Sequence, residues 1–210
     1  MKYKLYSHRY AGAILETDDE FTYLWEEIKE ILVNITEENI ISYFEMEDAY
    51  GNRVFKNKSI SRTINDLLKK EFMNKGWSSE SDIFQDSYYV GDTWRLDFAK
   101  DNISIEVAFN HGSVIAWNLL KPVLASELNH VKKAIQTKIG IIICATEEMK
   151  RAGGFDNAIG TYEKFIDYLK PLSNQLTVPL LIIGLEKPET FWIKHKKVKG
   201  KNIGFVQYFY

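Results

Sequence analysis

Hydrophobic residues recur every three or four positions in two stretches near the N-terminus, 21–35 and 61–72. This spacing predicts two amphipathic helices, the second with Ser61 as its N-cap. Charged residues such as Glu27 and Lys29 occupy the opposite, solvated face of the first helix. The residues predicted to face the core are Phe21, Leu24, Trp25, Ile28 and Leu32 in the first helix and Ile64, Leu67, Leu68 and Phe72 in the second.

The pattern changes after residue 82, where apolar and polar positions begin to alternate and continuous apolar runs of strand length appear. Continuous runs are typical of central strands covered on both faces. The predicted strands are 3–6, 93–99, 103–109, 139–145 and 178–185, with a closing pair within 191–210. Two further helices are predicted at 118–133 and 157–169. The first of them has a stripe of Leu120, Leu124, Leu128 and Val131. Loops are predicted at 76–82 and 152–158, and residues 46–60 are polar and irregular. This order predicts an α/β (α+β) fold with a mixed central β-sheet flanked by helices.

Composition narrows the class of protein. A chain of 210 residues, 45% hydrophobic and 14% aromatic, fits one folded domain, 1–210. Its net charge of −2 means that a nucleic-acid partner would need a local basic patch. The lone Cys144 lies in an apolar run and is predicted to be a core residue, which fits a reducing compartment. With no signal core and no run of membrane length, we expect a cytoplasmic protein without a membrane partner.

Two carboxylates interrupt the predicted hairpin LDFAKDNISIEVAFNHG, residues 96–112. Side chains alternate between the faces of a strand. Glu106 therefore shares a face with Ser104 and Ala108, and Asp97 shares one with Arg95 and Ala99, opposite to Leu96 and Phe98. If Asp101-Asn102 forms a two-residue turn, Asp97 falls directly opposite Glu106, with Cβ atoms roughly 5 Å apart.

Like charges at that separation must share a proton or a cation. A shared proton would indicate acid–base chemistry on a small molecule. A shared cation indicates a hard metal such as Mg²⁺, which can activate water for phosphodiester hydrolysis. A simpler interpretation is that Asp97 pairs with Arg95, and Glu106 with a lysine, on a solvated face of the sheet.

The hairpin resembles the PD-(D/E)XK nuclease signature, and more narrowly the BglII/BstYI family of type II restriction endonucleases. In that family the motif is Asp, eight residues, then Glu-Val-Gln-Phe; here Asp97 is followed by eight residues and Glu106-Val107-Ala108-Phe109. The similarity extends in order along most of residues 1–187. The further matching segments are YSH, LWEEIKEILVNI, INDLLKKEFMNKGW, LASELNH, IGIIICATEEM, TYEKF and VPLLIIGL.

The resemblance implies a Mg²⁺-dependent endonuclease that cleaves double-stranded DNA at a short palindromic site as a homodimer, with a heterodimer as the alternative. The catalytic hairpin would be 93–110. Asp97 and Glu106 would be catalytic and would hold the metal together with the main-chain carbonyl of Val107. The loop after the glutamate faces the major groove in this family, which makes Asn110, His111 and Ser113 candidate DNA contacts.

The third motif position departs from the family pattern, because Lys or Gln in the relatives is Ala108 here. A methyl group can neither position nor activate water. Asn110 could take over part of the role, the metal could act more alone, or the chain could be an inactive nuclease. The last case supports an alternative function, a DNA-binding subunit that no longer cuts and works with an active partner chain. An enzyme acting on a small metabolite is disfavoured, because the sequence has no phosphate loop, nucleophile elbow or cofactor fingerprint.

Basic residues suggest where DNA phosphates would be held. The C-terminal strand region 188–210 contains the basic run KHKKVKGK. This run is expected to bind DNA phosphates; the alternative is that it is ordinary solvated surface. Its candidate phosphate contacts are Lys194, Lys196, Lys197 and Lys199. Lys121, Lys132 and Lys133 on the predicted helix after the motif are expected to meet the DNA backbone or to flank a dimer helix.

Overall fold

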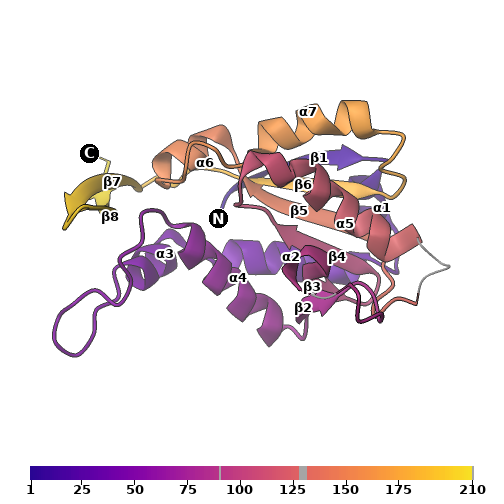
Figure 1. Ribbon diagram of the computed structural model, residues 1–210, viewed down its shortest axis with the longest axis horizontal. Coiled ribbons are helices and arrows are strands. Elements are labelled where there is room, and N and C mark those ends of the chain that lie inside the picture. Colours follow the sequence, from indigo (N-terminus) through magenta and orange to yellow (C-terminus); the bar gives the residue numbers. More distant parts are fainter. Residues whose placement is uncertain (90, 128–131, 210) are drawn as a thin grey trace.

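A six-stranded mixed sheet forms the centre of the computed structural model, which describes residues 1–89, 91–127 and 132–209 (Figure 1). The strand order is β1-β6-β5-β4-β3-β2. β4, β5 and β6 run parallel, while β1, β3 and β2 are antiparallel to their neighbours. The bounds are β1 Tyr3–His8, β2 Ser78–Asp82, β3 Arg95–Lys100, β4 Ile103–Val107, β5 Ile139–Ala145 and β6 Leu180–Leu185. The predicted fold class is confirmed.

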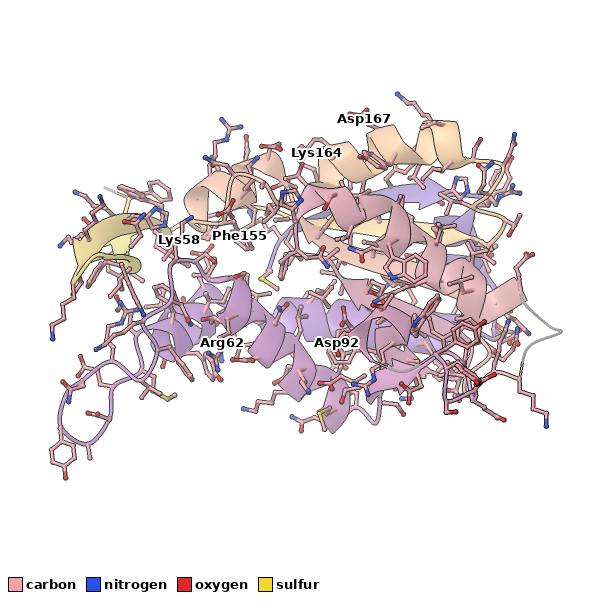
Figure 2. All side chains as sticks on the ribbon, viewed as in Figure 1. Lys58, Arg62, Asp92, Phe155, Lys164 and Asp167 are labelled. Carbon is pink, nitrogen blue, oxygen red and sulfur yellow. The ribbon has the colours of Figure 1, made fainter. Side chains whose placement is uncertain are left out.

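Helices cover both faces of this sheet. The N-terminal helices pack on one face, and α5 and α7 pack on the other (Figure 1). On α7, Lys164 and Asp167 point away from the sheet (Figure 2). The bounds are α1 Ala11–Thr17, α2 Thr22–Asn34, α3 Glu37–Phe44, α4 Ser61–Asn74, α5 Ile115–Glu127, α6 Glu147–Ala152 and α7 Tyr162–Leu172. Among helices in the described parts of the chain, none combines the length and the hydropathy that a membrane span requires.

The central strands have side chains in two separate cores, which explains their continuous apolar runs. On β5, Ile141 and Ile143 join the core under α2 and α4, whereas Ile142 and Cys144 join the core under α5 and α7. Burial raises the pKa of the Cys144 thiol well above its ordinary value, so this residue is a core side chain, as predicted. The nine apolar positions predicted for the first two helices are all buried.

Three predictions about individual elements are wrong. Residues 76–82 were expected to be a loop, but β2 begins at Ser78 as an edge strand whose polar side chains carry no apolar signal and whose backbone pairs with β3. Ser61 is the first helical residue of α4 and not its cap, because the chain enters the helix one residue earlier, at Ile60. The last predicted helix begins at Tyr162, not at residue 157.

The face of α5 also differs from the prediction. The helix ends at Glu127, and Leu128 and Val131 lie outside the described residues. Leu120 and Leu124 are only partly buried. The helix begins earlier than predicted, at Ile115, and its buried face is not the predicted leucine stripe. The buried residues of α5 are Ile115, Asn118, Leu119, Lys121, Pro122 and Ala125.

The closing pair of strands is confirmed as a separate two-stranded hairpin, β7 (Phe191–Val198) and β8 (Lys201–Tyr208). It lies at one end of the molecule, beside the irregular segment 46–60 (Figure 1). Arg53 Nη1 donates to the Gly204 carbonyl at 2.7 Å, and His195 Nε2 lies 3.1 Å from the carbonyl oxygen of Lys58, which Figure 2 labels near the hairpin. These contacts join the hairpin to the segment before α4.

Candidate active site

The turn between β3 and β4 sets the register that brings two carboxylates together. Asp101 adopts a φ of 47°, and Lys100 pairs with Ile103 across a two-residue turn, as predicted. The register continues through Phe98 and Ile105, so the next positions along it are 97 and 106. Because antiparallel pairs alternate, this position is a non-hydrogen-bonded one, where side chains approach most closely.

Glu106 is almost completely buried and is bound by a lysine from the helix above it. Glu106 is 3% exposed and Lys121 of α5 is 7% exposed. The Lys121 ammonium donates to Glu106 Oε2 at 2.8 Å. Glu106 Oε1 is also buried, and it has no hydrogen-bond partner among the described residues. One carboxylate oxygen is therefore held in place, and the other is buried without a partner among the described residues.

The surroundings of Glu106 disfavour its negative charge. Burial, followed by the nearby Asp97 carboxylate, raises the pKa of Glu106 from 4.5 to about 8, against the opposing effect of Lys121. Burial also raises the pKa of Asp97, against the opposing effects of the Val107 N–H and Lys121. Two carboxylates with raised pKa values at one place are typical of functional sites.

Asp97 is half-buried and is oriented by the backbone of the neighbouring strand. The Val107 N–H donates to Asp97 Oδ2 at 2.6 Å. The N–H and C=O of one strand residue point to the same side of the strand, so the Val107 carbonyl is directed toward the β3 side as well. Asp97 and Val107 line the same hollow, and Glu106, one residue before Val107, lies close enough to Asp97 for that charge to raise its pKa.

The simpler interpretation of the carboxylates holds only in part. Arg95 binds Asp82 at 3.0 Å and Asp92 at 3.7 Å, and it does not bind Asp97. Glu106 does pair with a lysine, but the face is buried under α5 and is not solvated.

The strand β3 turns at the site. Leu96 was expected to share a face with Phe98, but it packs in the cluster of Ala99 while Phe98 joins the larger core. The ladder between β2 and β3 skips the position where Asp97 would face Glu80, whose φ is 54°. This local distortion accounts for the change of face.

Close packing of α5 on the sheet brings Lys121 to Glu106. Gly140 of β5 lies under Pro122, and a Cβ at position 140 would overlap the proline ring. The absence of this side chain lets the helix approach the sheet one residue from Lys121. One turn earlier, Asn118 Nδ2 donates to Asn110 Oδ1 at 3.0 Å, which fixes the segment after β4.

Asp97 is reachable from outside through a hollow of about 130 Å³. Lys69 of α4 reaches across it to Glu80, with 2.5 Å between Nζ and Oε1. A second hollow of about 390 Å³ adjoins it, with Glu80 and Asp97 on the rim of both. The first hollow is lined by Asn65, Lys69, Ser79, Glu80, Asp97, Phe98 and Val107. Since a water molecule in the liquid occupies about 30 Å³, the hollow has room for an ion and a few waters.

The candidate DNA contacts lie in two regions. Asn110, His111 and Ser113 are exposed before α5, where His111 Nδ1 accepts from the Ser113 N–H at 3.1 Å. The hairpin lysines are exposed at the β7–β8 end of the molecule, away from the carboxylates (Figure 1). Those lysines are Lys194, Lys196, Lys197 and Lys199.

Sequence reasoning misjudged the lysines that follow the motif. Lys121 was expected to meet DNA or to flank a dimer helix, but it is buried on Glu106. Lys132 and Lys133 do not belong to α5, and Lys133 Nζ donates to the Ala125 carbonyl at 3.2 Å. The predicted helix began at residue 118, and its stripe through Leu120 left Lys121 off the buried face. The buried face contains Asn118, Lys121 and Ala125 at helical spacing, but two of these three side chains are polar, so the apolar pattern gave no signal for it.

Comparison with known proteins identifies the family. The family model described as restriction endonuclease BglII/BglIII matches residues 3–185. Among solved structures, restriction endonuclease BglII complexed with a DNA 16-mer is similar with a TM-score of 0.65 and 20% identity, and free BglII with 0.54 and 21%; each match covers 100% of both chains. No protein with a curated description matches. Because the family model covers most of its length, the chain belongs to the BglII/BglIII family of restriction endonucleases, which are type II site-specific deoxyribonucleases.

Proposed function

We propose that this chain cleaves both strands of DNA at a short specific site in a Mg²⁺-dependent reaction, as a homodimer in the cytoplasm, with residues 1–210 acting as one nuclease domain. One observation carries the proposal: the buried Glu106 Oε1 has no partner among the described residues and lies on the carboxylate that faces Asp97 across the strand pair. The similar BglII structure in complex with DNA supports the choice of substrate.

The residues present fit a hard divalent cation. The described part of the chain contains no group of three or more Asp, Glu, His or Cys side chains that could hold a metal. Mg²⁺ is commonly bound by one or two carboxylates, with water and substrate phosphates as the other ligands. Asp97 and Glu106 would hold the ion, with the Val107 carbonyl as a third oxygen. When bound, such an ion polarises a phosphoryl oxygen and lowers the pKa of water.

The residues of the chain orient and hold these ligands. The Val107 N–H fixes one oxygen of Asp97, and the Lys121 ammonium fixes one oxygen of Glu106. Each carboxylate therefore presents its other oxygen in a defined direction, which lowers the entropy lost when a ligand binds. Asn110, His111 and Ser113 follow directly after β4, where they would contact DNA next to the cleavage site.

The remaining DNA contacts would come from the hairpin. Its exposed lysines would bind phosphates and orient the duplex without reading the sequence. Lys196 Nζ lies 5.1 Å from the centre of the Phe205 ring, so the hairpin surface combines cations with aromatic side chains.

Cleavage of unmethylated phage DNA tests the proposal. The purified chain should cut at discrete sites with Mg²⁺ and not with EDTA, and sequencing the ends would give the site. Asp97→Ala should abolish cutting, whereas Asp167→Ala, on the outward face of α7, should leave it unchanged (Figure 2). Continued cutting by Asp97→Ala would show that the metal assignment is wrong.

Ala108 supports a second candidate function, a sequence-specific DNA-binding subunit that does not cut and works with an active partner chain. Ala108 is 1% exposed and packs in the core under α5, so its methyl group has no contact with substrate. In this case the unmodified chain binds duplex DNA without cutting it, and Ala108→Gln gains cleavage. Cutting by the unmodified homodimer would rule this function out.

A further inference from the structure

Lys121 is a buried lysine whose hydrogen-bonding capacity is mostly unused. Its ammonium has three N–H donors. Among the described residues, it has one acceptor, Glu106 Oε2. The side chain of Lys121 is 9% exposed, so little bulk water is available to the remaining donors. Buried donors usually have partners, and a buried pair of this kind seldom adds stability compared with apolar side chains of similar size. Two unused donors beside a buried carboxylate therefore point to a ligand.

The position of this ammonium is related to the departure at Ala108. Ala108 lies directly after the end of β4, two residues beyond Glu106, and its N–H donates to the Ile143 carbonyl of β5 at 2.8 Å. Ile115 and Leu119 of α5 pack in the core with Ala108, and Lys121 lies two residues beyond Leu119. The helix that packs on the alanine therefore also carries the ammonium that binds Glu106.

We propose that Lys121 is a catalytic residue, whose free N–H donors bind the attacking water or an oxygen of the scissile phosphate. The inference rests on the proposed function and deepens it. It assigns the cationic donor of the reaction to helix α5 and not to the strand that bears Glu106. Bound phosphate oxygens carry negative charge, and a fixed ammonium in a buried site stabilises charge that develops on them during hydrolysis. The Lys121 ammonium also holds Glu106 in a fixed orientation.

The test compares Lys121→Met and Lys121→Arg with a matched control, Lys150→Met. Lys150 is a mostly buried lysine, with a side chain 12% exposed, that binds Glu147 at a similar distance, 2.7 Å, on helix α6. The measurements are the melting temperature, the affinity for a duplex containing the cleavage site with Ca²⁺ in place of Mg²⁺, and the single-turnover cleavage rate with Mg²⁺.

We expect Lys121→Met to bind the duplex within about threefold of the unmodified protein and to cleave it about 100-fold more slowly or worse, as on removal of one donor from a reaction site. Lys121→Arg should recover part of the rate, and Lys150→Met should lower the melting temperature without a comparable loss of rate. A purely structural role would lower the melting temperature of Lys121→Met and leave its rate near that of the control.

A binding measurement separates the two oxygen ligands. The scissile phosphate is replaced by an uncharged methylphosphonate, and DNA binding is measured without metal. If the ammonium contacts the phosphate, this replacement should weaken DNA binding by the unmodified protein more than DNA binding by Lys121→Met. Equal effects, with the cleavage defect, assign its contact to the attacking water. The inference about Lys121 alone fails if the unmodified protein and Lys121→Met both cut DNA normally while Asp97→Ala does not. If the unmodified protein does not cut DNA, the proposed function fails first.

Discussion

Replacing Glu106 by Gln is predicted to stabilise the metal-free protein. The gain in the free energy of unfolding should increase as pH rises. The carboxyl of Glu106 has a pKa of about 8 in the folded chain, chiefly because of burial, against 4.5 as its ordinary value. Protons therefore bind more tightly to the folded chain than to the unfolded one. Between those two values the unfolded chain ionises first, so the stability of the protein falls as pH rises from about 4.5 to about 8.

The size of the effect follows from the two pKa values. Each pKa unit corresponds to about 1.4 kcal/mol, so the whole displacement is about 5 kcal/mol in the free energy of unfolding. Between pH 5 and pH 8 the unmodified protein should lose about 3–4 kcal/mol through this one group. Glu106→Gln keeps nearly the same volume and an oxygen acceptor for Lys121, but it has no proton to lose. The stability difference between the two proteins should therefore widen by this amount.

Urea unfolding in EDTA at pH 5, 6, 7 and 8 measures the difference. Glu147→Gln is the control, because a hydrogen bond from Lys150 lowers the pKa of Glu147 below its ordinary value of 4.5. The stability contributed by that ionised carboxylate is lost only as pH falls below about 5, so the control difference should stay flat over this range. A difference in the free energy of unfolding between Glu106→Gln and the unmodified protein that stays constant from pH 5 to pH 8 would refute the assignment of a buried carboxyl with a raised pKa at position 106.

Three further predictions concern packing and binding. Gly140→Ala should destabilise the protein by about 1–3 kcal/mol in chemical denaturation, because the added methyl overlaps Pro122, and should slow cleavage by displacing Lys121; an unchanged stability would show that α5 is less closely packed. Replacing the four hairpin lysines by Gln should reduce the slope of log affinity for duplex DNA against log salt by about 0.9 for each phosphate that is no longer bound, and an unchanged slope would exclude them from the interface. Cys144 should react with a thiol reagent only on unfolding, since fast native labelling would contradict its burial.

Local features of the sequence determined the helices at 21–35 and 61–72, the apolar central strands and the register of the carboxylate hairpin. Helical and strand periodicities depend on the spacing of side chains along one segment, so they can be read without the rest of the fold. The same holds for the turn at Asp101, because a two-residue hairpin loop sets the pairing of both strands and hence places position 97 opposite position 106.

Tertiary structure alone decided what surrounds those carboxylates. The polar edge strand β2 is stabilised by its pairing with β3, and its own side chains carry no apolar pattern. Lys121 reaches Glu106 because Gly140 lets α5 approach the sheet, a contact between segments that are far apart in the sequence. Burial and the net pKa of Glu106 depend on this packing, because the free energy of a charge is set by every group and solvent molecule around it. Residue spacing within one segment contains no information about those neighbours.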